Sequence, residues 1–297
     1  MAPSSAPATP DVIATTTARG DAPIQHDANA RARARRRRLV VLAIQIGLLA
    51  VFLGGWELSA DLNIIDQFFF GRPIRIVDQL REWVVNGTDL GPLWEQVVVT
   101  LSEAGIGFAV GTIAGIICGI ALGRVRILAE IFSPYIKVLN SIPRIVLGTI
   151  FIVWFGLDST SKIALAIVLV FFGVFFNAFQ GTREVDRNLV ANARILGASK
   201  RQVTWQVVLP SAMTWIIASL HISFGFALIG AIVGEFLGAQ KGLGMLIQQA
   251  QQSFNPDGVF AAMIIISVVA LVAEGLISLL EKRLLSWRPP QLSGADL

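Results

Sequence analysis

The chain has 297 residues, of which 54% are hydrophobic and 15% charged, and its mean hydropathy is +0.68. A soluble domain carries about 25% charged residues, so this composition excludes an ordinary soluble protein and indicates a membrane protein. The net charge of +4 does not indicate nucleic-acid binding, because the basic residues lie beside apolar runs, where they set membrane topology. A single cysteine, Cys118, excludes an internal disulfide, and with only two histidines it argues against a structural zinc site.

The N-terminal region combines a polar tail with a basic stretch. Residues 1–30 are rich in Ala, Pro, Thr and Ser and show no apolar periodicity, which is typical of disorder. Residues 31–38, RARARRRR, directly precede an apolar run of 18 residues at 39–56. A signal peptide has the same order of charge and apolarity, but its apolar core is usually about 7–15 residues long. We therefore predict a disordered, basic cytoplasmic tail over residues 1–38, followed by an uncleaved first membrane span.

Five further runs approach the length and apolarity needed to cross a bilayer, which takes about 20 residues. They cover about residues 98–123, 144–157, 161–180, 211–238 and 259–280. The third span of the chain is short and follows Pro134 and Pro143, so we expect a kinked or re-entrant helix there. The sequence thus predicts an all-α membrane protein with about six transmembrane helices over residues 39–285 and a cytoplasmic tail over 286–297.

The distribution of positive charge predicts the orientation of these spans. With six spans, 19 of the 24 Lys and Arg residues fall in segments on the side of the N-terminus, and five fall on the other side. Cytoplasmic segments of membrane proteins carry this excess of positive charge. We therefore expect both termini to be cytoplasmic.

Glycines recur every four residues in two of the spans. The second span contains Gly107, Gly111, Gly115, Gly119 and Gly123, and the fifth contains Gly230, Gly234 and Gly238. A stripe without side chains lets another helix approach closely. We interpret both stripes as helix-packing faces and not as sites of chemistry.

A polar segment that contains a glycine and a proline, residues 183–210, separates the fourth and fifth spans. Apolar residues at helical spacing predict a helix up to Leu196, and Gly197 suits its C-terminal end. Ser199 followed by Gln202 matches a capping box, which would start a second short helix. Pro210 is well placed in the first turn of the next helix. We therefore predict a cytoplasmic helix–turn–helix hairpin, which could rest on lipid headgroups or dock a cytosolic partner.

This hairpin resembles the "EAA" loop of bacterial ABC importer membrane subunits. That loop has the pattern E-A-A, three residues, G, nine residues, I, one residue, L-P. The matching positions here are Ala191, Asn192, Ala193, Gly197, Val207, Leu209 and Pro210. The chain departs from the pattern by carrying alanine in place of the glutamate and asparagine in place of the middle alanine.

The resemblance extends over about residues 70–285. Residues 141–166 and 229–247 look like the nitrate, sulfonate, taurine and bicarbonate branch of these permeases. It implies a type I ABC importer-like bundle in which two membrane subunits, here two copies of one chain, form the translocation path. It also implies that the hairpin couples to a cytosolic ATPase and that a periplasmic or lipid-anchored binding protein delivers the substrate.

The residues agree with a division of labour between subunits. The chain contains no GxxxxGK[ST] phosphate-binding loop, so ATP and Mg²⁺ are expected on the partner ATPase and no cofactor is expected here. We expect no enzymatic activity of the chain itself. A membrane-embedded enzyme would need converging acid–base or metal-binding groups, and two scattered histidines supply none.

Polar residues inside the spans are candidates for a substrate path. They are Glu103, Asn177, His221 and Glu235. Each could instead form an interhelical hydrogen bond, and Glu235 would repel an anion, so it is expected to be structural or part of a gate. The segment 66–94 mixes aromatic residues with three arginines, and it could anchor at the interface or dock the binding protein.

The sequence therefore predicts an ABC importer permease for a small anion such as nitrate, an alkanesulfonate or taurine. A permease for a thiamine or riboflavin precursor is the nearest alternative within the superfamily. A secondary transporter driven by an ion gradient is the alternative from another class, with Glu103, Glu235 and Glu274 as proton relays.

Overall fold

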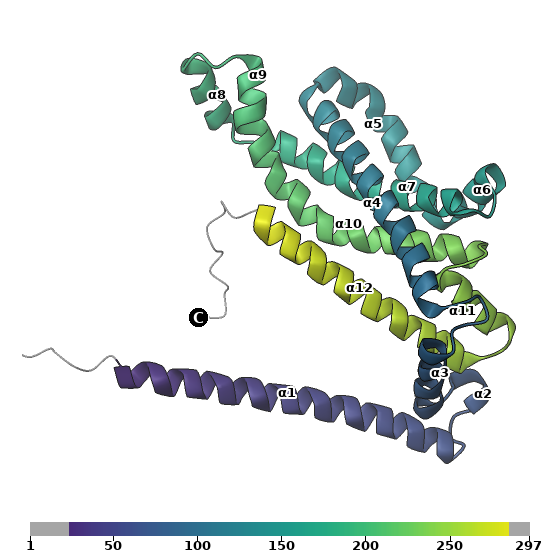
Figure 1. Cartoon of the computed structure of the whole chain (residues 1–297). Helices are drawn as coiled ribbons and strands as arrows, with labels where there is room; N and C mark the ends of the chain where they lie inside the picture. Colours follow the sequence, from purple (N-terminus) through teal and green to yellow (C-terminus); the bar gives the residue numbers. More distant parts are fainter. Residues whose placement is uncertain (1–23, 285–297) are drawn as a thin grey trace, which may run out of the picture. The chain divides into compact units, whose positions relative to one another are not determined.

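The computed structural model describes residues 24–284, which form two compact units on either side of the bond between Leu58 and Ser59. Residues 1–23 of the expected N-terminal tail and the expected C-terminal tail, 286–297, lie outside the described residues. Figure 1 shows that the described chain is almost entirely helical.

The first unit is dominated by one long helix, α1 (Ile24–Asp61). This helix contains the predicted first span, but it begins well before it. Residues 24–38 are therefore helical, where the sequence predicted a disordered tail. The physical reason is the alternation of Ala and Arg before the apolar run, because both residues are strong helix formers and extend a helix that the apolar run sustains.

The second unit holds the remaining helices. In chain order they are α2 (Gln67–Phe70), α3 (Pro73–Val85), α4 (Leu93–Arg124), α5 (Arg126–Ser141), α6 (Arg144–Phe155), α7 (Ser159–Arg183), α8 (Arg187–Ile195), α9 (Lys200–Val203), the π-helical turn η1 (Thr204–Val208), α10 (Leu209–Leu237), α11 (Leu243–Gln252) and α12 (Pro256–Leu284).

Five helices within residues 24–284 are long and apolar enough to cross a membrane, and a bent pair brings the number to six. The pair is α5 and α6, whose axes meet at 89° across the break at Ile142 and Pro143. The proline disfavours helical geometry in the residue before it, and Ile142 is extended. The predictions of an all-α protein with about six spans and of a kinked third span are both confirmed.

The core of the second unit forms where α7 packs between α4 and α10. Its central cluster is made of small and β-branched side chains from all three helices, together with one leucine. Such residues let helix backbones approach closely, which is the usual basis of helix association in a membrane.

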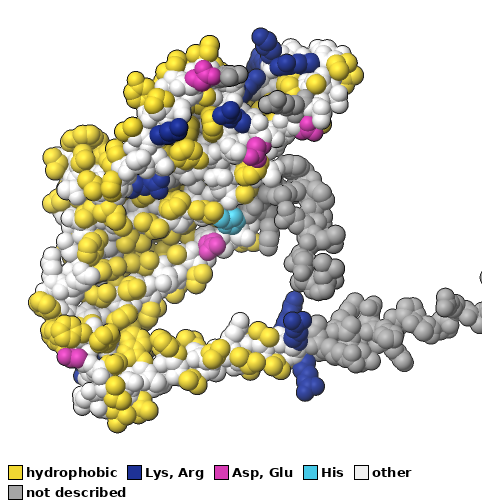
Figure 2. All heavy atoms as spheres, turned by 180° about the vertical axis from the view of Figure 1, so that it is seen from behind, with side chains coloured by type: hydrophobic (Ala, Val, Ile, Leu, Met, Phe, Trp, Pro, Cys, Tyr) yellow, Lys and Arg dark blue, Asp and Glu magenta, His cyan; other side chains and the backbone are white. Residues whose placement is uncertain are grey.

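The second unit has two distinct ends. We call the end with α8 and α9 the hairpin end and the end with α3 and α11 the α11 end (Figure 1). Helix α10 connects them, and its 29 residues span roughly 43 Å at 1.5 Å per residue. Figure 2 shows hydrophobic side chains over much of this unit and Lys and Arg gathered toward the hairpin end.

Candidate functional site

The glycine stripe of α4 lies along α7. At Gly107 an added Cβ atom would come within 2.4 Å of the Cβ atom of Ala166, and at Gly111 within 2.8 Å of the Ile167 carbonyl oxygen. The three glycines that follow at four-residue intervals would meet α7 in the same way, at 2.7–2.9 Å. Because several of these nearest atoms belong to the backbone, no side chain fits at these positions without separating the two helices.

Helix α10 approaches α7 in the same manner from another side. An added Cβ atom on Gly230 would lie 2.6 Å from the Cα atom of Ala166, and one on Gly234 would lie 3.0 Å from Lys162. Ala166 is fully buried. It therefore marks the point where α4, α7 and α10 come closest together.

At the α11 end, the carboxylate of Glu235 closes the loop between α10 and α11. Glu235 is fully buried and accepts hydrogen bonds from the Thr100 hydroxyl at 2.6 Å and from the Gly244 N–H at 2.7 Å. Gly244 lies in the first turn of α11, where N–H groups have no partner within the helix. A carboxylate at this position also interacts favourably with the helix dipole.

Two side chains of α4 complete the cap of α11. The Gln96 amide oxygen accepts from the Gly242 N–H at 2.8 Å, and the Thr100 hydroxyl oxygen accepts from the Leu243 N–H at 2.9 Å. Gln96 and Thr100 are both fully buried and lie one turn apart on α4. The N–H groups of the N-cap residue Gly242 and of the first two residues of α11 are therefore bound by side chains from α4 and α10. This role of Gln96 and Thr100 was not predicted from the sequence, although the four-residue spacing of polar residues inside an apolar helix could have indicated it.

A buried lysine lies beside this cap. Lys162 is fully buried in the first turn of α7, and its ammonium donates to the carbonyl oxygens of Leu157 at 2.5 Å and Asp158 at 3.1 Å. Glu103 and Glu235 lie close enough to interact electrostatically with it. Glu103 is 2% exposed, and its Oε2 atom has no hydrogen-bond partner among the described residues. Lys162 falls inside the predicted span over residues 161–180, but no role was predicted for it.

The structure brings two of the four path candidates together and separates the others. Glu103 and Glu235 both lie near Lys162, whereas Asn177 is half-buried on α7 and donates to the Gly173 carbonyl of its own helix. His221 is half-buried on α10, and Glu274 is exposed on α12. Within residues 24–284, no three His, Cys, Asp or Glu side chains are arranged to hold a metal ion.

At the hairpin end, the turn between α8 and α9 has a defined backbone geometry. Gly197 has φ +86°, its N–H bonds the Arg194 carbonyl, and the Ala198 N–H bonds the Ala193 carbonyl, which together make a Schellman motif. Ser199 then caps α9 in a reciprocal capping box with Gln202. Both features lie where the sequence placed the turn.

The second helix of the hairpin is continuous with α10. Residues 200–237 form one helical run, in which Pro210 lies in the first turn of the segment labelled α10. The sequence did not predict this continuity. Proline lacks an N–H and its ring crowds the carbonyl four residues earlier. The π-helical turn η1, in which the Leu209 N–H bonds the Thr204 carbonyl five residues back, lies directly before it. The second helix of the hairpin and the fifth span therefore form one continuous helical rod.

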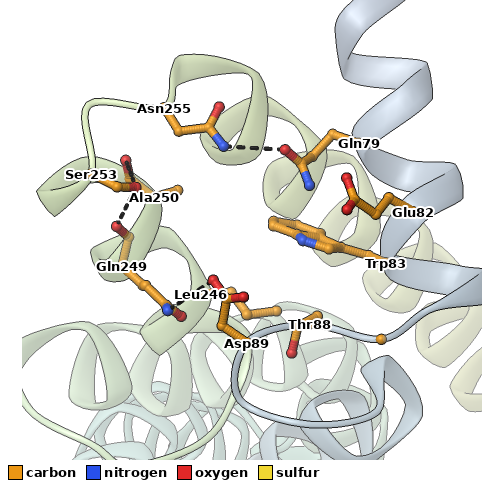
Figure 3. Close-up of a pocket in the computed structure, with 11 residues that line it drawn as sticks. Gln79, Glu82, Trp83, Thr88, Asp89, Leu246, Gln249, Ala250, Ser253 and Asn255 are labelled. Carbon is orange, nitrogen blue, oxygen red and sulfur yellow. Dashed lines mark hydrogen bonds between the residues drawn. The ribbon is translucent and has the colours of Figure 1, made fainter.

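A small polar cavity of about 220 Å³ opens at the α11 end (Figure 3). Helix α3 contributes Glu82 and Trp83, and the turn after it contributes Asp89. Gln249 of α11 donates to Asp89 at 3.2 Å, and Asn255 donates to Gln79 at 3.1 Å. The cavity thus lies between α11 and the segment 66–94, which is the docking candidate predicted from the sequence, and its lining carries two carboxylates.

Residues 111–286 match the family of binding-protein-dependent transport system inner membrane components. The chain belongs to this family. It is a multi-pass inner-membrane permease, in agreement with the resemblance of its hairpin and its spans to that family.

Curated relatives place this permease near sulfonate and taurine transporters. It is 32% identical over 239 residues to the putative aliphatic sulfonates transport permease protein SsuC of Bacillus subtilis, covering 80% of this chain and 85% of the relative. It is 30% identical over 253 residues to the taurine transport system permease protein TauC of Escherichia coli, covering 83% and 90%. A formylaminopyrimidine transport permease protein, ThiX of Halalkalibacterium halodurans, is 31% identical over 238 residues, covering 80% and 92%.

Solved structures agree on the fold of this permease. An inward-facing methionine ABC transporter, MetNI, matches with a TM-score of 0.51 at 20% identity, covering 65% of this chain and 92% of that chain. An amino acid ABC transporter crystallised with histidines matches with a TM-score of 0.52 at 21% identity, covering 64% and 92%. The fold of the permease is that of these importers.

The family match begins inside α4, so some of the buried polar residues at the α11 end lie within the matched residues and others lie before them. Lys162, Glu235 and the hairpin lie within residues 111–286, whereas Gln96, Thr100 and Glu103 precede them. The hydrogen bonds that cap α11 therefore connect the matched residues, 111–286, to the first half of α4, which precedes them.

Proposed function

We propose that this chain is the membrane-spanning subunit of an ATP-driven importer and that two copies form the path for a small anion such as taurine, an alkanesulfonate or nitrate. Its relatives named for sulfonate and taurine transport support this substrate class. Both termini and the hairpin face the cytoplasm, in line with the excess of positive charge on that side. ATP and Mg²⁺ bind to a separate ATPase subunit.

The observation that carries the proposal is the exposed apolar surface of the hairpin. Ile195 is 81% exposed, Leu196 is 86% exposed and Trp205 is 62% exposed. An exposed apolar patch at the tip of a protruding helical hairpin is typical of a surface that docks a partner. Because the second helix of the hairpin, which carries Trp205, is continuous with α10, a push on this part of the surface acts directly on the fifth span.

A β-branched residue at Gly197 should uncouple transport from ATP hydrolysis. An added Cβ atom at this position meets nothing within 4 Å, so Gly197→Val acts only through the backbone, whose φ of +86° costs valine roughly 1–3 kcal/mol. We expect Gly197→Val to lose ATPase-driven uptake at an unchanged membrane level. Gly197→Asn is the matched control, because asparagine tolerates this conformation. Equal uptake in both variants would show that the turn geometry is not used in coupling.

The substrate class is tested with the permease reconstituted with its ATPase and binding protein. Taurine or ethanesulfonate should stimulate ATP hydrolysis and accumulate inside the vesicles. Stimulation by formylaminopyrimidine alone would instead favour the thiamine-precursor alternative, which the relative ThiX supports. Uptake that persists when the ATPase is inactivated at its catalytic glutamate would favour the secondary transporter.

The binding protein is expected to dock at the α11 end, opposite the hairpin. The polar cavity with Glu82 and Asp89 lies there, and its volume of about 220 Å³ suits one long side chain. Small-molecule sites usually have roughly 300–1,000 Å³. Two carboxylates would repel an anionic substrate, so we assign this cavity to protein docking and not to the translocation path.

A further inference from the structure

A second and larger cavity, of about 980 Å³, lies at the hairpin end between α4, α5 and α7. Its walls come from the last turn of α4, the middle of α5 and the last third of α7. The proposed transport mechanism assigns no role to it.

The rim of this cavity is cationic. Arg124 is the last residue of α4, Arg183 is the last residue of α7, and Lys137 comes from α5. Among the described residues that line the cavity, Glu130 is the only acidic one, so these residues carry a formal charge of +2. Basic residues at helix C-termini are common, because they complement the helix dipole. Here, however, three cations from three helices converge on one hollow.

The inner wall of the same cavity is aromatic. Phe175, Phe176 and Phe179 form it, and the rings of Phe175 and Phe179 stack with their centroids 6.0 Å apart. The Arg183 guanidinium lies over the Phe179 ring at 5.2 Å, which joins the cationic rim to the aromatic wall. Phe176 is 39% exposed. The cavity therefore offers positive charge at one end and an open apolar wall beside it.

Helix α5 lacks a full set of protein contacts. None of its described side chains is fully buried, and its main helix neighbour is α4, to which it is joined through Val125. The cavity separates α5 from the aromatic face of α7. A molecule that fills the cavity would provide the contacts that hold α5 in place.

We propose that this cavity binds an anionic phospholipid, with its phosphate at Arg124, Arg183 and Lys137 and an acyl chain along the phenylalanines. A lipid headgroup and a small soluble ligand could both present the organic phosphate or sulfonate anion that these basic residues would bind. The aromatic wall and the volume favour the amphipathic source, since a small soluble anion would leave both unused. Basic pockets between membrane helices on the cytoplasmic side are a recognised form of lipid headgroup site.

The test uses the purified full chain, stripped of lipid and mixed with phosphatidylglycerol or phosphatidylcholine micelles, with bound lipid counted by native mass spectrometry. Phosphatidylglycerol should be retained and should raise the thermal midpoint, whereas phosphatidylcholine should do neither. One basic residue contributes about fivefold to affinity for an anionic lipid surface, so Arg124→Gln with Arg183→Gln should weaken retention about 25-fold. The matched control is Arg75→Gln with Arg81→Gln, which removes the same charge at the α11 end.

A milder variant keeps the test valid if the double variant does not fold. Lys137→Gln, at an exposed position, should weaken phosphatidylglycerol retention about fivefold, and Lys137→Arg should restore it. Equal retention of both lipids, or equal losses in the site and control variants, would overturn the proposal. Stabilisation by glycerol 3-phosphate or taurine to the same extent as by phosphatidylglycerol would also overturn it, because it would identify a soluble-anion site. The proposal would also be overturned if the chain formed a dimer in which the cavity holds no lipid.

Discussion

Replacing Thr100 by valine is expected to destabilise the permease severely, although the two side chains have nearly the same shape. The hydroxyl donates to Glu235 and accepts from the Leu243 N–H, and Thr100 is fully buried. With valine, the Leu243 N–H would have no partner, and the Glu235 carboxylate would lose the hydrogen bond that it accepts from the hydroxyl. Each buried polar group left unsatisfied costs about 1–3 kcal/mol, so we expect a loss of about 2–6 kcal/mol.

Thr100→Ser is the matched control, since serine keeps the hydroxyl and loses only a methyl group. The comparison is made by thermal unfolding of the purified chain and by uptake in the reconstituted system. Serine should retain most of the stability and transport, and valine should lose both. If both substitutions lower the unfolding midpoint equally, the methyl contact and not the hydroxyl network holds the α11 end together.

Replacing Gly111 by leucine is expected to prevent correct packing of α4 on α7. The new Cβ atom would lie 2.8 Å from the Ile167 carbonyl oxygen and 2.8 Å from the Val170 Cβ atom. The carbonyl belongs to the backbone and cannot move without shifting α7. Overpacking of this kind costs about 1–3 kcal/mol or more, and the remaining atoms of leucine have no space at all. Folded yield after extraction and the unfolding midpoint should both fall sharply.

Gly105→Leu provides the control on the same helix. An added Cβ atom at Gly105 meets nothing within 4 Å, so leucine there changes helix propensity and hydrophobicity in the same way without a clash. We expect this variant to fold with an unchanged or slightly higher midpoint, because leucine is the better helix former by up to about 1 kcal/mol. A similar loss in both variants would mean that the close packing seen here does not limit stability.

Local rules predicted the parts of this molecule that are encoded locally. The spans follow from runs of apolar residues, and the turn at Gly197 and the capping box at Ser199 follow from residues a few positions apart. The four-residue spacing of glycines places them on one helix face, but the sequence alone does not show which helix covers that face. The structure shows that α7 does so for α4.

The parts that sequence reasoning missed depend on distant segments. Lys162 lies in the predicted span over residues 161–180, but its role becomes apparent only when the Leu157 and Asp158 carbonyls are placed around its ammonium. The roles of Gln96 and Thr100 likewise depend on a loop more than 140 residues later. The continuity of the hairpin with α10 was missed for a local reason, because a π-helical turn before Pro210 has no recognised residue pattern.

The position of Ala166 limits how this protein can change shape. A Cβ atom added to Gly107 of α4 would lie 2.4 Å from the Ala166 Cβ atom. A Cβ atom added to Gly230 of α10 would lie 2.6 Å from the Ala166 Cα atom. Because glycine leaves the helix backbones in direct contact at these points, separating the helices would open voids and lose that packing. The three helices α4, α7 and α10 are therefore expected to move as one rigid body, carrying the hairpin with them. The opening and closing that transport requires would then fall to the surrounding helices, with the 89° elbow between α5 and α6 as the natural hinge.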